Sequence, residues 1–517
     1  MNLNHMITQG PPGGQSPPPG PRWLLAVLPV VVLLSRLPFL EPGYGLHADA
    51  WIVAIAGQEI HRTGEYHPSR FPGYPLQEYA VSHLVSHGPP AVNGATAVFS
   101  AAAALFLALL MRALGGRHWF LGPLAFALTP IVYNNSTLAL DYLWAMAFVL
   151  AGLYAGVRRW YLLAGVLLGL AAGCRLTSVV MLAALWLLII PPEDRRGLIR
   201  GWLVSGLAAA AVGLACYWPL LSRYGRGFLR YYNEAAYPSI PELAKSMTVG
   251  VLGWLGLAAV VLGLAGHVLR RVHRKRGGTA APLAAVNNRH DQDHGRGKES
   301  ATVPPRQRVP AGSPWIAAAW LVPSGLYLLA YLLMPIKIDY LIPIVPLALL
   351  LLERRLRGWA FAAICVGLIL SPFVGYPTWE APIRWDHLKR QDQAAFLQDV
   401  LRRAGQTRQK ILVLSGRADL ILLHVAQTSL WPQPACSYEP DLTWSEGSPV
   451  VLRMDLRPRS AGPDCLVRIA YLPDAAAIRE LAAQGFRVTY LPSAGEWYPK
   501  KIGIDWREFG ASGFCAR

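Results

Sequence analysis

The sequence predicts a mainly α-helical protein that crosses a membrane many times and ends in a small α/β domain. The 517 residues are 53% hydrophobic and only 15% charged, whereas soluble proteins carry about 25% charged residues. Long apolar runs fill residues 22–375, and each approaches the ~20 residues that cross a bilayer as a helix. Residues 376–517 have an aqueous composition instead, with short β-branched fragments typical of strands.

The apolar runs divide into about eleven candidate spans of transmembrane length. These cover residues 22–40, 90–111, 118–134, 138–157, 160–174, 176–190, 201–221, 249–269, 314–334, 340–352 and 358–375. Residues 1–21 are rich in Pro and Gly and predict a disordered segment. The first span lacks a small-residue cleavage site, which favours a retained helix over a signal peptide.

Positive charges gather in alternate loops and predict the orientation. One side carries Arg112, Arg117, Arg158, Arg159, Arg195, Arg196, Arg200, Arg270, Arg271, Arg274, Lys275, Arg276, Arg354, Arg355 and Arg357. The positive-inside rule makes this side cytoplasmic. We therefore expect an inner (plasma) membrane protein with a cytoplasmic N-terminus and an extracytoplasmic C-terminal domain. The net charge of +18 then reflects topology, and no nucleic acid partner is expected. The external loop 222–248 is basic against this rule.

Two further segments have soluble character. Residues 270–313 are basic and of low complexity, which favours a disordered cytoplasmic linker over a metal site at His290 and His294. In the tail, the fragments KILVLSG, CLVRIAYLP and FRVTYLP predict strands, and DAAAIRELAAQG predicts a helix before the last of them. This order of strand, helix and strand indicates a small α/β domain with a parallel sheet.

The six cysteines show no metal-ligand spacing. Cys174, Cys216 and Cys365 lie in apolar runs and are expected to be small core residues. The tail contains Cys436, Cys465 and Cys515. Two of these three can form a disulfide only if the tail faces an oxidising compartment.

Five ionisable residues fall at the same predicted membrane face. They are Asp49, Asp141, Arg175, Lys337 and Asp339. A charge at the bilayer centre costs about 2.5–3.5 kcal/mol, so such residues are usually paired or functional. One of them alone could equally be a helix-end charge, but acids and bases together favour a polar site.

The first external loop, residues 41–89, strengthens this prediction. Apolar positions from Trp51 to Ile60 recur at helical spacing and indicate a helix along the interface. A surface helix alone does not explain the acid beside His47, nor the rigid segment that contains Pro72, Gly73 and Pro75.

These residues resemble the GT-C class of integral-membrane glycosyltransferases, and its branch of protein mannosyltransferase and aminoarabinose transferase relatives. The similarity spans residues 22–352. It consists of an acid in the first external loop (HADAW), a base before a Pro-rich segment (SRFPGYPLQEY), the run TPIVYNNSTLALDYL, an arginine after a small-residue helix (GLAAGCRLTS) and the stretch YLIPIVPLALLLL. The sequence departs from the usual pattern where Ala48 and Ala50 flank a single acid and where Gly73-Tyr74 replaces two adjacent prolines.

The resemblance implies a role for each matched residue. Asp49 would be the catalytic base, and Asp141 a second acid that shapes the site. Arg70 would contact the donor phosphate, with Arg175, Lys337, His47 and Tyr340 as further substrate-binding candidates. Asp49 and Asp141 are the candidate ligands of a divalent cation, Mg or Mn. The expected partners are a polyprenyl-phosphate sugar donor, a lipid, glycan or protein acceptor, and membrane lipids.

The chemistry fits this set of residues. Glycosyl transfer needs a base for the acceptor hydroxyl and cations for the leaving phosphate, and a single carboxylate base favours inverting displacement. No GxGxxG after a strand and no Walker sequence is present. Two alternatives remain. A lipid or glycolipid transporter or flippase predicts internal repeats, and none is evident. A membrane-anchored scaffold would leave function to the C-terminal domain, which has no recognised catalytic pattern.

Overall fold

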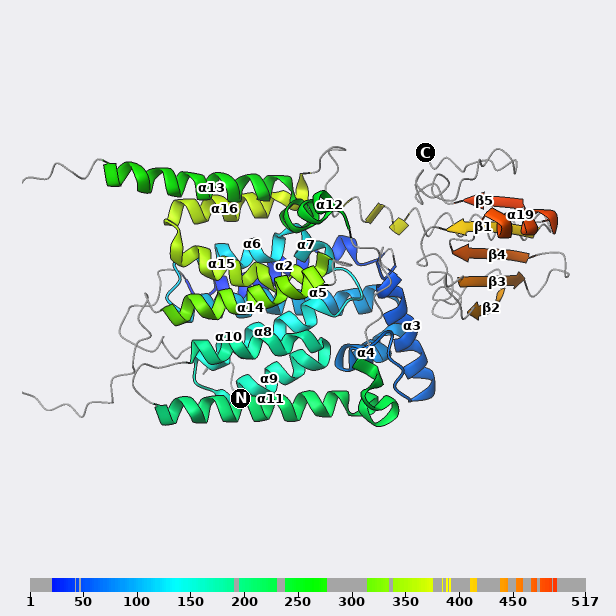
Figure 1. The fold of residues 1–517 in the computed structure, drawn as a ribbon, viewed down its shortest axis with the longest axis horizontal. Helices are drawn as coiled ribbons and strands as arrows, with labels where there is room; N and C mark the ends of the chain where they lie inside the picture. The colour runs from blue at the N-terminus through cyan, green and yellow to red at the C-terminus, as the bar shows by residue number, and fades with distance from the viewer. Residues whose placement is uncertain are drawn as a thin grey trace, which may run out of the picture.

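The computed structural model describes two kinds of structure, a bundle of helices and a five-stranded sheet (Figure 1). The described residues are 21–41, 43–45, 48–189, 195–229, 238–276, 314–333, 338–374, 384, 387–388, 390–391, 410–415, 438–444, 452–458, 466–471, 475–485 and 487–490. The predicted disordered segment 1–21 lies outside them except for Pro21.

Every predicted span contains at least one helix. The bundle helices are α2 (Leu24–Leu34), α5 (Pro89–Ala113), α6 (Leu121–Leu128), α7 (Pro130–Asn135), α8 (Tyr142–Val157), α9 (Tyr161–Cys174), α10 (Met181–Leu188), α11 (Arg195–Tyr224), α13 (Val251–Arg276), α14 (Pro314–Leu333), α15 (Ile344–Arg355) and α16 (Gly358–Leu370). Among the described residues, four helical stretches are long and apolar enough to cross a membrane, and several shorter helices are also apolar. The chain is therefore a multi-pass integral membrane protein.

Two helix boundaries differ from the predicted ones. The span predicted at 118–134 is divided into α6 and α7, because Pro130 forces Thr129 out of the helical region to a ψ of 131°. Helix α13 continues to Arg276, into the range predicted as a disordered linker. Basic side chains are favourable at a helix C-terminus, where they face the negative end of the helix dipole. The rest of that linker, 277–313, lies outside the described residues.

A row of glycines lets α9 approach α11 closely. Gly165, Gly169 and Gly173 recur every fourth residue of α9, and a Cβ added to any of them would lie 2.3–2.6 Å from an atom of α11. Small residues at this spacing are typical of helix pairs packed within membranes. The contact fixes the orientation of α9, whose C-terminal end leads into the site described below.

We expect Gly169→Leu to separate α9 from α11 and to lower the apparent melting temperature of the detergent-solubilised protein. The added side chain would overlap Val212, because a Cβ at position 169 would lie only 2.6 Å from the Cβ of Val212, and overpacking typically costs about 1–3 kcal/mol. Gly325→Leu is the matched control, since its added Cβ meets nothing within 4 Å. Equal melting temperatures for the two variants would contradict the close packing.

Two loops predicted to lie on the same side of the membrane contact one another at one end of the bundle. Arg354, at the end of α15, donates a hydrogen bond of 3.1 Å to the carbonyl of Leu114, just after α5. The backbone N–H of His118 donates to Oε1 of Glu353 at 2.7 Å. The basic loops after α5 and α15 therefore share one end of the bundle.

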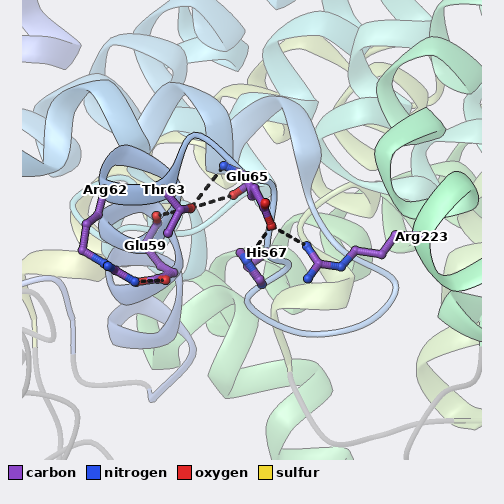
Figure 2. A network of polar contacts seen from close by, with 6 residues as sticks. All are labelled: Glu59, Arg62, Thr63, Glu65, His67 and Arg223. Atoms are coloured by element: carbon purple, nitrogen blue, oxygen red, sulfur yellow. Dashed lines mark hydrogen bonds and ion pairs between the residues drawn. The ribbon is translucent and has the colours of Figure 1, made fainter.

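The helix predicted in the first loop is present as α3 (Ala48–Thr63), and a second helix, α4 (Pro75–Leu84), follows it. Both lie at one end of the bundle (Figure 1). Trp51, Ala56 and Ile60 are buried, so the apolar face of α3 packs inward. Glu65, after α3, lies 3.4 Å from Arg223 near the end of α11, and Figure 2 shows this contact. Arg223 of the basic stretch 222–248 thus pairs with an acid of the first loop.

The described part of the tail forms one sheet in the order β2-β3-β4-β1-β5. The predicted fragments are β1 (Lys410–Ser415), β4 (Leu466–Tyr471) and β5 (Arg487–Tyr490), and they pair in parallel with α19 (Ala475–Ala483) between the last two in sequence. The sequence did not predict β2 (Tyr438–Trp444) and β3 (Leu452–Pro458), which add as antiparallel strands and make the sheet mixed. The three tail cysteines lie outside the described residues, and the other three are free.

Candidate functional site

Two aspartates and two arginines from four separate segments form one ion-paired cluster, here called the acid–arginine cluster. Arg70 reaches both acids, with Nη1 2.9 Å from Oδ2 of Asp49 and Nη2 3.6 Å from Oδ1 of Asp141. Arg175 completes it, with Nη1 2.6 Å from Oδ2 of Asp141. The four charges balance, which reduces the cost of burying them.

The antiparallel packing of α8 and α9 brings Asp141 and Arg175 together. Asp141 immediately precedes α8, and Arg175 immediately follows α9. A short turn at 158–160 joins these helices at the opposite end, so the start of one lies beside the end of the other. An acid suits a helix N-terminus and a base suits a C-terminus. Each residue is therefore in a favourable place on its own helix before the ion pair forms.

Tyrosine rings surround the arginines. The guanidinium carbon of Arg175 lies 3.9 Å from the ring centre of Tyr142 and 4.7 Å from that of Tyr340. Arg70 lies over the ring of Tyr74 at 4.6 Å, and its Nε donates a hydrogen bond of 3.1 Å to the Tyr74 hydroxyl. Cation–π contacts strengthen when desolvated. They fix both guanidinium groups without neutralising them.

The members of the cluster differ in accessibility. The side chains of Asp141 and Arg175 are 0% and 6% exposed, whereas those of Asp49 and Arg70 are 15% and 22% exposed. Asp49 lies in the first turn of α3, where Nε1 of Trp51 donates to the carbonyl of Gly45 at 2.7 Å. Asp49 and Arg70 are therefore the pair that a substrate can reach, and the other pair lies beneath it.

A further acid, Asp339, is buried with an amide partner. The Nδ2 of Asn135 donates a hydrogen bond of 2.8 Å to Oδ1 of Asp339, and both side chains are largely buried. Asn135 begins a glycosylation sequon, and its nitrogen is occupied by this contact and by the carbonyl of Ile131. Asp339 directly precedes Tyr340, whose ring contacts the guanidinium group of Arg175.

The structure brings together Asp49, Arg70, Asp141, Arg175 and Tyr340 of the predicted site residues. His47 and Lys337 lie outside the described residues. Sequence reasoning missed Tyr74, Tyr142 and Glu78. Tyr74 lies in the Pro-rich segment of the first loop, and Tyr142 directly follows Asp141. Arginine side chains often stack on aromatic rings, so tyrosines near the predicted arginines could have been added to the site. Glu78 follows Pro75 in the first turn of α4, which is a favoured place for an acid.

Glu78 holds the segment that carries Arg70. The side chain is 0% exposed. Its Oε1 accepts a hydrogen bond of 2.8 Å from the backbone N–H of Ser69, and its Oε2 accepts one of 3.1 Å from that of Tyr74 and another from the Tyr66 hydroxyl. Burial raises the pKa of the Glu78 carboxyl, and these hydrogen bonds oppose that rise.

The acid–arginine cluster as arranged does not suit a divalent cation. Asp49 and Asp141 each face a guanidinium group, so a cation between them would have to displace Arg70. Mg and Mn prefer several oxygen ligands in octahedral geometry. No group of three or more His, Cys, Asp or Glu side chains suited to a metal occurs in the part of the chain that the structure describes.

Comparison with known families matches residues 74–287 to the model of Glycosyltransferase family 87. This range runs from the start of α4 past α13 and includes Asp141 and Arg175, whereas Asp49 and Arg70 lie outside it. No curated protein matches the chain. The part of the helical bundle from α4 to α13 therefore resembles that of a membrane-embedded glycosyltransferase. Over these residues the chain is similar to glycosyltransferase family 87, which is a GT-C family of membrane enzymes. The GT-C class predicted from resemblance is confirmed.

Proposed function

We propose that this protein transfers a sugar from a polyprenyl-phosphate donor to an acceptor hydroxyl, with Asp49 as the base and Arg70 as the phosphate-binding cation. The observation that supports this most directly is the contact of one guanidinium group with two carboxylates, at 2.9 and 3.6 Å. A base and a cation within one side chain's reach are what direct displacement at a phosphate-linked sugar requires.

The proposed step is an inverting displacement. The acceptor oxygen attacks the anomeric carbon while Asp49 takes the hydroxyl proton. The bond from the anomeric carbon to the phosphate oxygen breaks, and its electron pair leaves with the polyprenyl phosphate. Arg70 stabilises the negative charge that grows on that oxygen, because charge-assisted hydrogen bonds from a guanidinium group suit phosphate. Asp141 and Arg175 keep Arg70 in place from beneath.

We assign the reaction to the extracytoplasmic face on the basis of the charges in the loops. The basic loops after α5 and α15 meet at one end of the bundle, and the positive-inside rule assigns that end to the cytoplasm. The acid–arginine cluster belongs to the loops predicted on the other side. The C-terminal sheet would then be extracytoplasmic, and binding of the acceptor is a role open to it.

The direct test incubates the purified full-length protein with a panel of polyprenyl-phosphate sugars and candidate lipid, glycan and protein acceptors. Transfer from at least one donor supports the proposal. A transporter would instead move an intact glycolipid between leaflets of proteoliposomes without breaking the glycosidic bond. Translocation with no transfer from any donor would overturn the proposal in favour of the transporter.

We expect EDTA to leave this transfer unchanged, because arginine side chains already neutralise both candidate metal-binding carboxylates. The measurement is the initial rate before and after chelation, with re-addition of Mg and Mn as the matched control. A loss of the rate that Mg or Mn restores would contradict this expectation and show that transfer depends on a divalent cation.

A further inference from the structure

The loop between α3 and α4 carries Arg70 and is held from within. Its residues Tyr66, Ser69 and Tyr74 all donate hydrogen bonds to the carboxylate of Glu78. The backbone also turns back on itself, since the N–H of Gly73 donates to the carbonyl of Arg70 at 2.7 Å. Glu78 therefore closes the loop at both sides of Arg70.

Helix α11 buttresses the same loop from the other side. The Tyr217 hydroxyl donates a hydrogen bond of 3.1 Å to the carbonyl of Gly73. Gly73 has a φ of +86°, and a Cβ there would lie 2.8 Å from Leu220 and 2.9 Å from the Tyr66 hydroxyl. The loop thus has little room to move while these contacts persist.

A buried acid at position 78 lowers the stability of the fold unless its oxygens accept hydrogen bonds. A buried carboxylate loses its hydration, and no Lys or Arg lies within ion-pair distance of Glu78 among the described residues. Backbone N–H groups on both sides of Arg70 need an acceptor with several lone pairs, and a carboxylate provides about four. A smaller neutral acceptor would satisfy fewer of them.

We propose that Glu78 is a positioning residue: by binding the N–H groups of Ser69 and Tyr74 and the hydroxyl of Tyr66, it sets the place of Arg70 for the donor phosphate. This inference rests on the proposed function for the identity of the ligand. The connection to the reacting atoms runs through Tyr74, whose N–H binds Glu78 and whose hydroxyl accepts the hydrogen bond from Nε of Arg70.

The experiment compares Glu78→Ala, Glu78→Gln and Tyr66→Phe in the transfer assay, with kcat and the KM for the donor determined separately. We expect Glu78→Ala to raise the donor KM about tenfold or more, because a displaced Arg70 binds phosphate less well. Glu78→Gln keeps one carbonyl acceptor and should recover part of that loss. Tyr66→Phe removes one of the hydrogen bonds to Glu78 and keeps the carboxylate, so it tests the same loop by a smaller change.

The matched control is Glu59→Gln, an acid of the same loop region that pairs with Arg62 at 2.5 Å on the surface. It should leave both parameters unchanged. A merely structural Glu78 would lower the amount of folded protein and leave the donor KM of the remaining enzyme unaltered. That outcome for both Glu78 variants would overturn the inference.

A second measurement keeps the inference separate from the proposed function. If the unaltered protein transfers no sugar from any donor, the proposed function fails, and sugar-free polyprenyl phosphate becomes the binding probe. Weaker binding by Glu78→Gln, together with faster hydrogen exchange at the amides of Ser69 and Tyr74, would still support positioning of an anion-binding Arg70. Unchanged binding with unchanged exchange would overturn it.

Discussion

Asp49→Asn is expected to abolish sugar transfer while the protein still folds and still binds the donor. An amide of the same shape cannot accept the proton of the acceptor hydroxyl, and the loss of a general base typically costs about 10²–10⁴ in rate. Folding should persist because Asp49 is partly exposed and Arg70 keeps its contact with Asp141. The measurement is the transfer rate at saturating donor, alongside the elution profile in detergent.

Glu65→Gln is a suitable control for that variant, because it removes an acid of the same loop, residues 41–89. Within the described part of the chain, the exposed Glu65 side chain forms an ion pair with Arg223 and lies 3.8 Å from Nε2 of His67 (Figure 2). Exposed pairs contribute little to stability, so this variant should transfer sugar at the unaltered rate. Undiminished turnover of Asp49→Asn would remove Asp49 as the base and return the assignment to the other acids of the cluster.

Arg175→Met is expected to have the largest effect on stability. It leaves the fully buried Asp141 without its nearest cation, and breaking a buried pair from one side typically costs about 3–5 kcal/mol. Three tyrosine rings would also lose the guanidinium group that they surround. The measurement is the apparent melting temperature in detergent at a fixed heating rate.

The double variant Asp141→Asn/Arg175→Met tests the physical reason. It removes both charges of the buried pair, so most of the lost stability should return. Transfer should remain impaired, because Arg70 then contacts only one carboxylate and loses its support from beneath. A double variant as unstable as Arg175→Met would mean that packing of the arginine side chain, and not the unpaired charge, carries the effect.

These variants separate two functions within one cluster of charges. The buried pair of Asp141 and Arg175 lies where two helix ends meet and fixes the geometry. The accessible pair of Asp49 and Arg70 is carried by the first loop and can exchange one partner for a substrate. We expect donor binding to draw Arg70 from Asp49 towards the phosphate, which leaves the carboxylate ready to accept a proton.

The apolar runs were sufficient to predict the helices, because a run near 20 residues satisfies its backbone only as a helix within a bilayer. They predicted boundaries less well. Pro130 divides one span into α6 and α7, and α13 extends through a basic stretch that composition assigned to a linker. The strands β2 and β3 lack the β-branched runs by which β1, β4 and β5 were predicted.

By itself the sequence predicted the membrane character, the positions of the spans and that Asp49, Asp141 and Arg175 share one side, since these follow from local composition and from the charges of alternate loops. Only the tertiary structure decided which charge pairs with which. Arg70 comes from a loop whose course depends on Glu78 and Tyr217, and Arg175 meets Asp141 only because α8 and α9 pack antiparallel. Distances between helices depend on side-chain packing across the bundle, which no local pattern in the sequence records.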